Sequence, residues 1–213
     1  FSECSNIVTV SNESKYELLR LRNIKKCVTV IYNGVPDYKK INILDNIDIS
    51  NTIKNTNRKV IGFIASLDSR KGHKTLFEAI SLMKIEIPDI LCLIIGKGTK
   101  SQYNDVCKQI EICKKEKNII LCGFKENAGI YISILDAYVH PSTAFESFPM
   151  SILEAMSSCV PIIATDVGGI NDMLSGGDAG IVVRPGNAKE LADNIIQVLR
   201  NKDLRNDLIS CAR

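Results

Sequence analysis

The chain has 213 residues and a formal net charge of +3 at pH 7, and 45% of its residues are hydrophobic and 24% charged, the ordinary balance of a globular protein. The length is enough for one full domain, or for one domain and part of a second. So small a net charge, without a basic run interleaved with aromatic residues, argues against nucleic acid as a partner, and the longest apolar runs are well short of a membrane span.

Two strands and a helix are expected at the start of the chain. The strands cover 6–11 and 28–36, the second of which ends in an Asn-Gly turn and a proline, and the helix covers 12–22. A polar, Asn-rich stretch over 42–58 follows without clear periodicity. We interpret this stretch as a loop that leads into the main domain.

From residue 59 onward, strand-like and helix-like segments alternate. The expected strands are continuous apolar runs, which indicates that helices cover both faces of the sheet. We therefore predict an α/β fold with a Rossmann-like parallel sheet flanked by helices. The strands are expected over 59–66, 89–96, 118–123, 137–142, 161–165 and 180–183, and the helices over 72–84, 101–116, 128–136, 149–158 and after Asn187, a cap with Glu190 three residues on.

Ligands of open parallel sheets bind beyond the carboxyl ends of strands, close to helix N-termini. After the strand 59–66, Arg70 and Lys71 precede a glycine and the start of a helix. Two cations at a helix start suit a phosphate group. A solvated basic loop explains the two residues equally well, because exposed Arg and Lys are common.

Gly96 and Gly98 follow the next strand and form a G-x-G turn that lets backbone approach a ligand. A plain tight turn fits the same residues as well. The dinucleotide-binding fingerprint is incomplete, because Ser101 stands where a third glycine is needed and the strand 118–123 does not end in an acidic residue.

The loop after the strand 161–165 contains Asp166, Gly168 and Gly169. Its glycines allow a close approach of backbone, although as an isolated motif it is an ordinary turn. Its position at the carboxyl end of a strand places it along the same crevice as the other loops.

The stretch FESFPMSILEAM (145–156) follows the predicted strand that ends at Ser142. Pro149 fits the first helical position, and the amides of Met150 and Ser151 would then point out of the helix start, where they can bind an anion. Glu154 lies about one turn further on. Its carboxylate can accept hydrogen bonds from hydroxyl groups beside that anion.

Helix capping is the competing interpretation of this stretch. Ser151-x-x-Glu154 matches a capping box, and so does Thr143-x-x-Glu146. Because capping motifs are frequent, capping is the favoured interpretation when these residues are considered alone.

The eight cysteines form no C-x-x-C pair, and neither His73 nor His140 lies near a pair of cysteines. A zinc site is therefore not expected. Cys92 and Cys122 lie inside apolar strand-like runs, where they act as small hydrophobic residues and suit a reducing cytoplasm. The chain begins at Phe1 without methionine, which we interpret as the start of a fragment.

Taken in order, these segments resemble the C-terminal, donor-binding domain of the retaining GT-B glycosyltransferases of family 4, the glycosyl transferases group 1. The ordered set is specific although each piece alone is modest, and it includes two glutamates separated by seven residues in ESFPMSILE. The likeness runs along almost the whole chain through VTVIYNGVP, IASLDSRKGHKTLFEAI, LIIGKGT, IILCGF, ESFPMSILE and EAMSSCVPIIATDVGG.

The resemblance implies roles for individual residues. Glu146 would lie near the donor sugar as a catalytic group, and Lys71 would neutralise the leaving diphosphate. Glu154 would accept hydrogen bonds from the ribose hydroxyls, and neither a metal nor another cofactor would be needed. The other donor-binding residues would be Arg70, Phe148, Met150, Ser151, Gly96, Gly98, Asp166, Gly168 and Gly169.

Two positions depart from the pattern of the family. Ser66 stands five residues before Lys71, where many members carry arginine, and Arg70 is the candidate to supply that charge. Pro149 stands where members usually carry glycine, and proline removes one backbone donor. Both departures concern contacts to the diphosphate.

The resemblance also implies a division of the chain. Residues 1–33 would be a remnant of the N-terminal acceptor domain and its linker, 34–200 the nucleotide-sugar-binding domain, and 201–213 the start of a truncated C-terminal helix. A missing N-terminal domain would hold the acceptor. The chain alone is then expected to bind donor and to transfer poorly or not at all.

The implied activity is transfer of a hexose-type sugar, with retention, from a nucleotide-diphosphate sugar to a glycan or lipid-linked glycan. Such an enzyme would serve cell-surface polysaccharide biosynthesis in the cytoplasm, with peripheral association at the cytoplasmic membrane face. Two alternatives stay open: a non-catalytic nucleotide-sugar-binding module and a GT-B-fold nucleotide-sugar epimerase.

Overall fold

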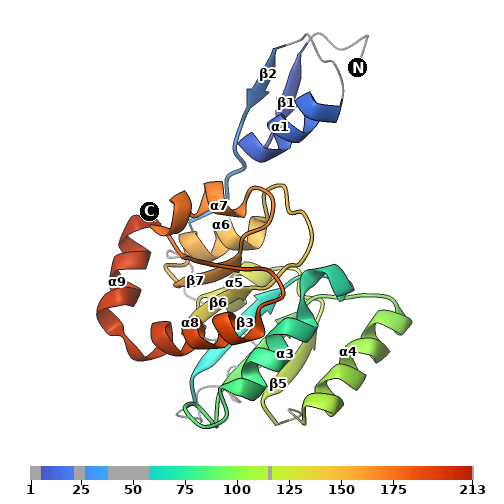
Figure 1. Ribbon diagram of the computed structural model, residues 1–213, viewed down its shortest axis with the longest axis vertical. Coiled ribbons are helices and arrows are strands. Elements are labelled where there is room, and N and C mark those ends of the chain that lie inside the picture. Colours follow the sequence, from blue (N-terminus) through green and yellow to red (C-terminus); the bar gives the residue numbers. More distant parts are fainter. Residues whose placement is uncertain (1–5, 22–26, 38–57, 115–116, 213) are drawn as a thin grey trace.

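The computed structural model describes residues 6–21, 27–37, 58–114 and 117–212 (Figure 1). Its main domain contains one sheet of six strands in the order β5-β4-β3-β6-β7-β8. All neighbouring strands are parallel, as the continuous apolar runs predicted. The strands are β3 (Val60–Ile64), β4 (Leu91–Ile95), β5 (Ile119–Gly123), β6 (Ala137–His140), β7 (Ile162–Thr165) and β8 (Ile181–Val183).

Helices cover both faces of this sheet (Figure 1). One layer consists of α3 (His73–Leu82), α4 (Lys100–Cys113), α8 (Ala188–Arg200) and α9 (Lys202–Cys211). The other consists of α5 (Ala128–Ile132), α6 (Met150–Ser157) and α7 (Ile170–Met173). The predicted α/β fold with a Rossmann-like parallel sheet is therefore confirmed.

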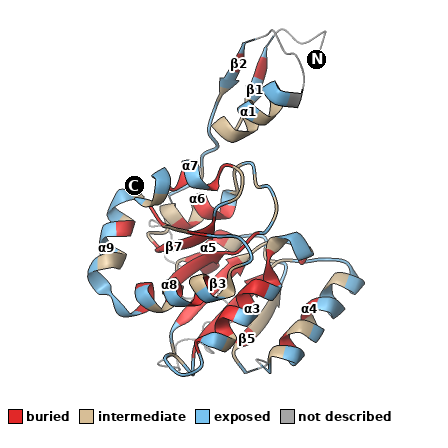
Figure 2. Ribbon diagram, in the orientation of Figure 1, coloured by how far each residue is buried: buried red, intermediate tan, exposed pale blue. Residues whose placement is uncertain are grey.

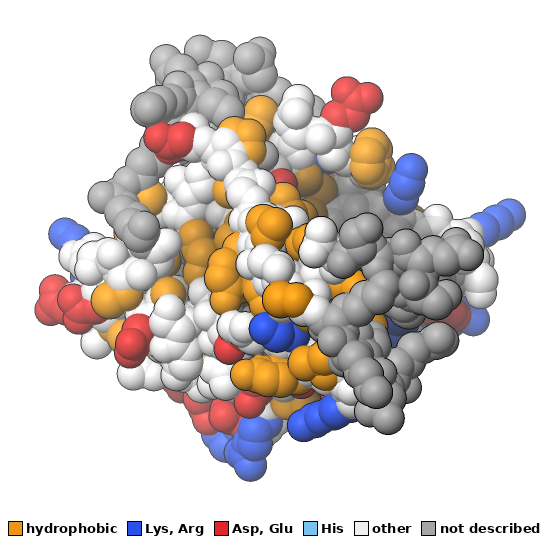
Figure 3. All heavy atoms as spheres, turned by 90° about the horizontal axis from the view of Figure 1, so that it is seen from above, with side chains coloured by type: hydrophobic (Ala, Val, Ile, Leu, Met, Phe, Trp, Pro, Cys, Tyr) orange, Lys and Arg blue, Asp and Glu red, His pale blue; other side chains and the backbone are white. Residues whose placement is uncertain are grey.

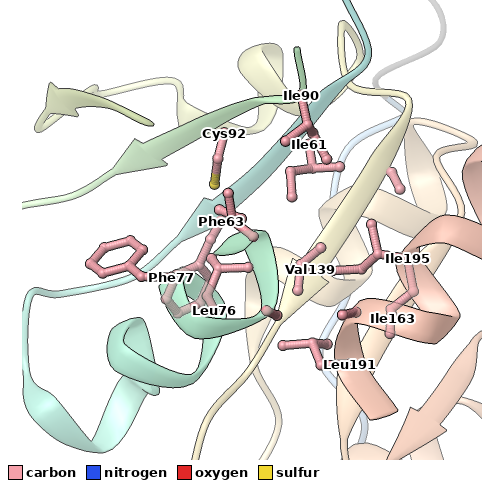
Figure 4. Close-up of a cluster of buried hydrophobic side chains, with 14 of the residues drawn as sticks. Ile61, Phe63, Leu76, Phe77, Ile90, Cys92, Val139, Ile163, Leu191 and Ile195 are labelled. Atoms are coloured by element: carbon pink, nitrogen blue, oxygen red, sulfur yellow. The ribbon is translucent and has the colours of Figure 1, made fainter. Parts of the chain in front are cut away.

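Successive residues of the central strand β3 enter different halves of the core. Ile61 and Phe63 pack in the cluster that includes α3 and α8, whereas Val60 packs with α5 and α6. Figure 4 shows Leu76 of α3 beside Phe63 in the first cluster, and Figure 2 shows the buried residues concentrated along the sheet. The sheet is buried on both faces, which is why its strands are apolar at most positions.

The strand order reverses between β3 and β6. The chain proceeds outward from β3 through β4 to β5, then returns to the other side of β3 and proceeds outward again through β6, β7 and β8. At such a reversal the loops after the two central strands diverge and leave a crevice at their carboxyl ends, which is where open α/β sheets bind ligands. The loops after β3 and β6 are therefore the first place to look for a site.

The N-terminal segment forms a separate unit at one end of the molecule (Figure 1). It consists of β1 (Ile7–Thr9), α1 (Asn12–Leu21) and β2 (Val28–Val30), with β1 and β2 paired in parallel. Several of its large hydrophobic side chains are more than half exposed, namely those of Val8, Tyr16, Ile31 and Tyr32. Figure 3 views the molecule from this end and shows hydrophobic side chains at the surface.

Three sequence predictions of element length need correction. The strand expected over 28–36 ends at Val30, and residues 31–37 are irregular. The helix expected over 128–136 ends at Ile132, since Ser133 turns its hydroxyl back to a carbonyl of the helix. The helix expected over 101–116 ends at Cys113, because Lys114 adopts a left-handed conformation.

Other boundaries lie within a few residues of the prediction. Asn187 does begin α8, and its side chain accepts a hydrogen bond from the backbone N–H of Glu190 over 3.1 Å. The loop expected over 42–58 lies outside the described residues except for Arg58. In the part of the chain that the structure describes, no helix combines the length and the hydropathy that a bilayer crossing requires.

Candidate functional site

The two loops at the reversal of strand order bring Lys71 and Glu146 together. Lys71 ends the short 3-10 turn η2 (Ser69–Lys71) after β3, and Glu146 lies in the irregular segment between β6 and α6. Nζ of Lys71 donates a hydrogen bond to Oε1 of Glu146 over 2.5 Å, across 75 positions in the chain. The two side chains are only 26% and 13% exposed, so they form a partly buried ion pair.

Close packing between these loops explains the glycine that follows Lys71. Gly72 has a φ of +77°, and a Cβ atom at this position would lie 1.8 Å from the carbonyl oxygen of Pro141. The backbone N–H of Thr143 donates to the carbonyl of Arg70 over 2.8 Å, which ties the same two loops together. No side chain fits at Gly72, so the position of Lys71 depends on a glycine beside it.

The loop after β7 supports Glu146 from another direction. A Cβ atom on Gly168 would lie 2.1 Å from the carbonyl oxygen of Glu146, and the N–H of Gly169 donates to that oxygen over 2.8 Å. These two glycines therefore hold the backbone of Glu146. The third predicted residue of this loop, Asp166, is exposed at the end of β7.

Several partners act on the carboxylate of Glu146. Oε1 also accepts a hydrogen bond from Oγ of Ser142 over 2.6 Å and lies 3.6 Å from Nε2 of His140. Burial raises the pKa of Glu146, but the contacts with His140, Lys71 and Ser142 outweigh burial and hold that pKa at about 2. Burial lowers the pKa of His140. Glu146 is therefore ionised at neutral pH beside a neutral imidazole.

A buried polar chain extends behind Glu146 along β6. Nε2 of His140 lies 3.2 Å from Oγ of Ser142, and Nδ1 lies 3.3 Å from Oη of Tyr138. Oη of Tyr138 lies 2.7 Å from Oγ of Ser151 in the first turn of α6. Sequence reasoning missed this chain. The signal was available, because Tyr138 and His140 alternate on one face of a predicted strand that leads into Ser142.

Helix α6 begins differently from the prediction. It starts at Met150, and Pro149 occupies the N-cap position with a ψ of 117° rather than the first helical position. The amides of Met150 and Ser151 lie in the first turn, where backbone donors have no acceptor within the helix. Glu154 lies in the second turn, close enough for its charge to raise the pKa of Tyr138.

Both capping-box interpretations are wrong. Ser151 is inside α6 rather than before it, and its hydroxyl pairs with Tyr138. Thr143 begins no helix and donates its hydroxyl to the carbonyl of Arg70 over 3.2 Å. Glu146 and Glu154 are therefore not explained as members of capping boxes.

Arg70 points away from the Lys71–Glu146 pair. Its guanidinium bonds to both carboxylate oxygens of Asp68 over 3.0 and 3.1 Å, and its side chain is 69% exposed. Asp68 also caps η2 by accepting from the backbone N–H of Arg70. The structure thus pairs Lys71 with Glu146 but leaves Arg70 in a local pair with Asp68, with its own side chain largely exposed.

The G-x-G turn after β4 packs against the loop after β3. A Cβ atom on Gly96 would lie 1.8 Å from the carbonyl oxygen of Ala65, and one on Gly98 would lie 2.8 Å from Cβ of Leu67. The close approach that requires these glycines is therefore made by the protein's own backbone and side chains. The turn is part of the same edge of the sheet as Lys71.

Two apolar hollows lie beside this turn. One, of about 280 Å³, is lined by Leu67, Gly96 and Phe124, among others, and one of about 290 Å³ extends over Ala65 and Ala128. Nζ of Lys97 lies 4.5 Å from the ring centroid of the Phe124 side chain. The two hollows are therefore largely apolar, with Lys97 in the lining of both.

Residues of the N-terminal segment lie against the loops of the site. The ring of Tyr32 stacks on that of Phe148 with centroids 5.4 Å apart and an interplanar angle of 27°. A Cβ atom on Gly169 would lie 3.0 Å from Cβ of Ser11. Residues before the main sheet therefore touch both the Glu146 loop and the loop after β7, which the sequence did not reveal.

No group of three or more metal-ligating side chains occurs among the described residues. Of the described residues in the loops after β3 and β6, Lys71 and Glu146 form the ion pair that joins the two loops. The arrangement therefore offers a cation, a carboxylate and a helix N-terminus around one crevice, which suits an anionic ligand with hydroxyl groups attached.

Comparison with known proteins gives a consistent result. Residues 45–213 match the family model described as glycosyl transferases group 1. The chain is 29% identical over 150 residues to phosphatidyl-myo-inositol mannosyltransferase of Mycobacterium leprae, covering 69% of this chain and 39% of the relative. It is 26% identical over 219 residues to N-acetyl-alpha-D-glucosaminyl L-malate synthase of Bacillus anthracis, covering 99% and 55%.

Solved structures share the fold. A glycosyltransferase from Rickettsia africae superposes with a TM-score of 0.85 at 27% identity, covering 98% of this chain and 57% of the other. Anabaena HepE in complex with UDP and glucose superposes with a TM-score of 0.84 at 25% identity, covering 98% and 57%. This chain spans between about two fifths and three fifths of the length of these proteins. The family model covers most of the chain, and the chain belongs to the glycosyl transferases group 1 family.

Proposed function

We propose that the chain is the donor-binding part of a retaining glycosyltransferase of family 4, which transfers a hexose-type sugar from a nucleotide-diphosphate sugar. The observation that carries this proposal is the Lys71–Glu146 pair, which joins the loops after β3 and β6 at the reversal of strand order. Membership of the family and the likeness to HepE, whose structure holds UDP and glucose, support it.

Lys71 would stabilise the leaving group. Breaking the bond between sugar and diphosphate leaves negative charge on the diphosphate, and a fixed ammonium group lowers the cost of that charge. The first-turn amides of Met150 and Ser151 would add backbone donors at the positive end of the dipole of α6. With these groups in place we expect no metal and no other cofactor.

Glu146 and Glu154 would hold the hydroxyl groups of the donor. The side-chain contacts that Glu146 makes with Lys71, Ser142 and His140 all involve Oε1, so Oε2 is the atom that we assign to the sugar. Glu154, in the second turn of α6, would accept hydrogen bonds from the ribose. Ribose and sugar would then lie on either side of the diphosphate.

The apolar side of the crevice would take the nucleotide base. The lining of the larger part of these hollows is apolar, with glycines and Phe124, although Lys97 also lines both, and a weakly polar ring fits such a surface. Gly96 and Gly98 would keep this surface open. Arg70, Asp166, Gly168 and Gly169 stay in the proposal as neighbours of the donor, with the glycines acting through the backbone of Glu146.

The acceptor side is proposed to lie outside this chain. Residues 1–33 would be the end of an acceptor domain, 34–200 the donor domain, and 201–213 the start of a further helix. The exposed hydrophobic side chains of the N-terminal unit, such as those of Val8 and Ile31, support this division because they lack a covering partner among the described residues. We propose a glycan or lipid-linked glycan as acceptor, and work in the cytoplasm, at the inner membrane face, for cell-surface polysaccharide synthesis.

Titration calorimetry with UDP, GDP, ADP and NAD tests the donor site. We expect one of the nucleoside diphosphates to bind, and we expect Glu154→Ala to weaken its affinity by about 1–3 kcal/mol, since hydrogen bonds to a carboxylate are lost. Glu111→Ala, an exposed change on α4, should leave the affinity unchanged. Binding of NAD alone, or equal affinities for Glu154→Ala and the wild type, would contradict the proposal.

Whether the chain transfers sugar by itself is a separate question. Because it spans only part of the length of its relatives, we expect donor binding with poor or no transfer. A turnover assay with nucleotide sugars and a range of acceptors measures this, and robust transfer would refute the expectation. Conversion of the donor into its epimer would instead favour a nucleotide-sugar epimerase.

A further inference from the structure

Five polar side chains connect the first turn of α6 to Glu146 through the interior of the protein. In order they are Ser151, Tyr138, His140, Ser142 and Glu146, with neighbouring atoms 2.7, 3.3, 3.2 and 2.6 Å apart. The four members behind Glu146 are buried. Each of their contacts must therefore carry a proton, because a buried polar contact without one is repulsive.

The protons of this chain can be counted. Each hydroxyl group has one proton to donate, and a neutral imidazole has one, on either Nδ1 or Nε2. If Glu146 is ionised and His140 neutral, only one arrangement gives each of these four contacts a proton; the carbonyl oxygen of Ile64, 3.5 Å from Oη of Tyr138, then receives none. Ser151 then donates to Tyr138, Tyr138 donates to Nδ1 of His140, Nε2–H donates to Ser142, and Ser142 donates to Oε1 of Glu146.

Two other arrangements satisfy the same contacts. With a protonated Glu146, every donation reverses and His140 carries its proton on Nδ1. With an imidazolium at His140, both ring nitrogens donate, Tyr138 donates to Ser151 and Ser142 still donates to Glu146. Burial opposes the imidazolium, and Lys71 opposes protonation of Glu146. The charges that bear on the chain are those of Lys71, Glu146 and Glu154.

We infer that His140 is a positioning residue, which as the neutral Nε2–H tautomer orients the hydroxyl of Ser142 onto Oε1 of Glu146. The inference rests on the proposed function, because Glu146 is the residue that it positions. Ser142 and Lys71 both bond to Oε1 and so restrain rotation of the carboxylate, which leaves Oε2 as the oxygen that we assign to the donor. The same chain connects Glu146 to Ser151, so both ends of the donor site share one hydrogen-bond network.

Nitrogen NMR of the imidazole rings, recorded at pH 7 on the whole chain without nucleotide, tests the tautomer. The chain has only two histidines, so the signal that disappears in His140→Gln belongs to His140. We expect a protonated Nε2 and an unprotonated Nδ1. A proton on Nδ1, or an imidazolium, would overturn the inference. This measurement needs no nucleotide, so its result tests the tautomer of His140 independently of whether the proposed donor binds.

Substitutions in the hydrogen-bonded network of Ser151, Tyr138, His140 and Ser142 test whether this network positions Glu146. The carbon NMR titration of the Glu146 carboxylate should have a higher midpoint in Ser142→Ala and His140→Leu than in the wild type, because one contact that lowers it is lost while Lys71 stays in place. His140→Gln, which keeps one donor and one acceptor, should retain a lowered midpoint. If His140→Leu fails to fold, Ser142→Ala and His140→Gln still decide the matter.

Thr165→Val is the matched control. Thr165 is buried in the same region, and its hydroxyl bonds to the backbone carbonyls of His140 and Ser142. It does not belong to the side-chain network. It should lower stability and leave the midpoint of Glu146 in place. UDP or GDP should bind several-fold more weakly to Ser142→Ala than to His140→Gln. If the Glu146 carboxylate titrated with the same midpoint in Ser142→Ala and Thr165→Val, the network would not position Glu146, and His140 would serve only for packing.

Discussion

The two sides of the crevice are built on different physical principles. On the side of β3 and β6, charged and polar groups are buried and paired with one another before any ligand arrives, as in the contact between Lys71 and Glu146. On the side of β4 and β5, the surface is apolar and open, and Phe124 is 58% exposed. Hydrogen bonds between protein groups fix the side chains on the first side, whereas the second side presents an exposed apolar surface.

The comparison shows what each side requires of a ligand. In the proposed site a diphosphate would share Lys71 with Glu146, so its binding energy would depend on charge and on the network behind the carboxylate. A base needs only to cover an apolar surface that is already exposed. Both sides depend on glycines, since Gly72 and Gly96 each lie against a carbonyl oxygen of a neighbouring loop. Substitutions can separate these contributions.

The largest effect is expected for Gly72→Ala. Its left-handed backbone costs alanine about 1–2 kcal/mol, and the clash with the carbonyl of Pro141 adds a similar amount. We expect a loss of about 3 kcal/mol in the free energy of unfolding, measured by urea denaturation, together with weaker nucleotide binding as the Lys71 loop shifts.

Gly186→Ala separates the two causes. Gly186 has a φ of +74°, close to the +77° of Gly72, but no atom lies within 4 Å of the position that its Cβ would take. Its substitution should cost only the backbone contribution and leave nucleotide affinity unchanged. Equal losses at the two positions would show that close packing of the site loops does not matter.

The second effect contrasts the two adjacent cations. Lys71→Met should weaken binding of UDP or GDP by about 10- to 100-fold, because a hydrogen bond from a charged donor is lost. Arg70→Met should weaken it far less, since Arg70 is exposed and paired with Asp68. Calorimetric titration of both variants measures the ratio. A larger loss for Arg70→Met would mean that Arg70 turns into the crevice when the diphosphate binds.

The third effect is a pH dependence of stability. The pKa of Glu146 is lowered from 4.5 to about 2 in the folded protein, so its contribution is present above pH 4.5 and is lost as pH falls toward 2. In that range the unfolded state binds more protons. Each unit of pKa difference corresponds to about 1.4 kcal/mol. Glu146→Gln should therefore flatten the curve of unfolding free energy against pH between these limits.

The carboxylate of Asp68, whose partner Arg70 is 69% exposed, provides the comparison for that measurement. Its pKa is also lowered, chiefly by the hydrogen bond from Arg70, but solvent screens the pair. Asp68→Asn should change the curve much less than Glu146→Gln. A similar flattening by both variants would contradict the special role of burial at Glu146.

Sequence patterns predicted the parallel sheet well, because a strand buried on both faces is apolar at every position, as in residues 91–95. They also placed Lys71 and Glu146 at strand ends, where topology brings residues together. They could not predict the contacts that need three dimensions. The clash partner of Gly72 lies in another loop, and Tyr138 and His140 look like ordinary members of a strand until Ser142 and Ser151 are placed beside them.

The smallest effect is expected on the apolar side of the crevice. Phe124→Ala removes an exposed ring, and stacking of a base on such a ring contributes roughly 0.5–1.5 kcal/mol, so the affinity for UDP or GDP should fall about two- to tenfold. Tyr16→Ala, which removes a similarly exposed ring on α1, is the matched control and should have no effect. Affinity should fall less for Phe124→Ala than for Lys71→Met, because an open apolar surface loses only part of its contact area. The reverse order would mean that shape, rather than the prepared charges, dominates donor binding.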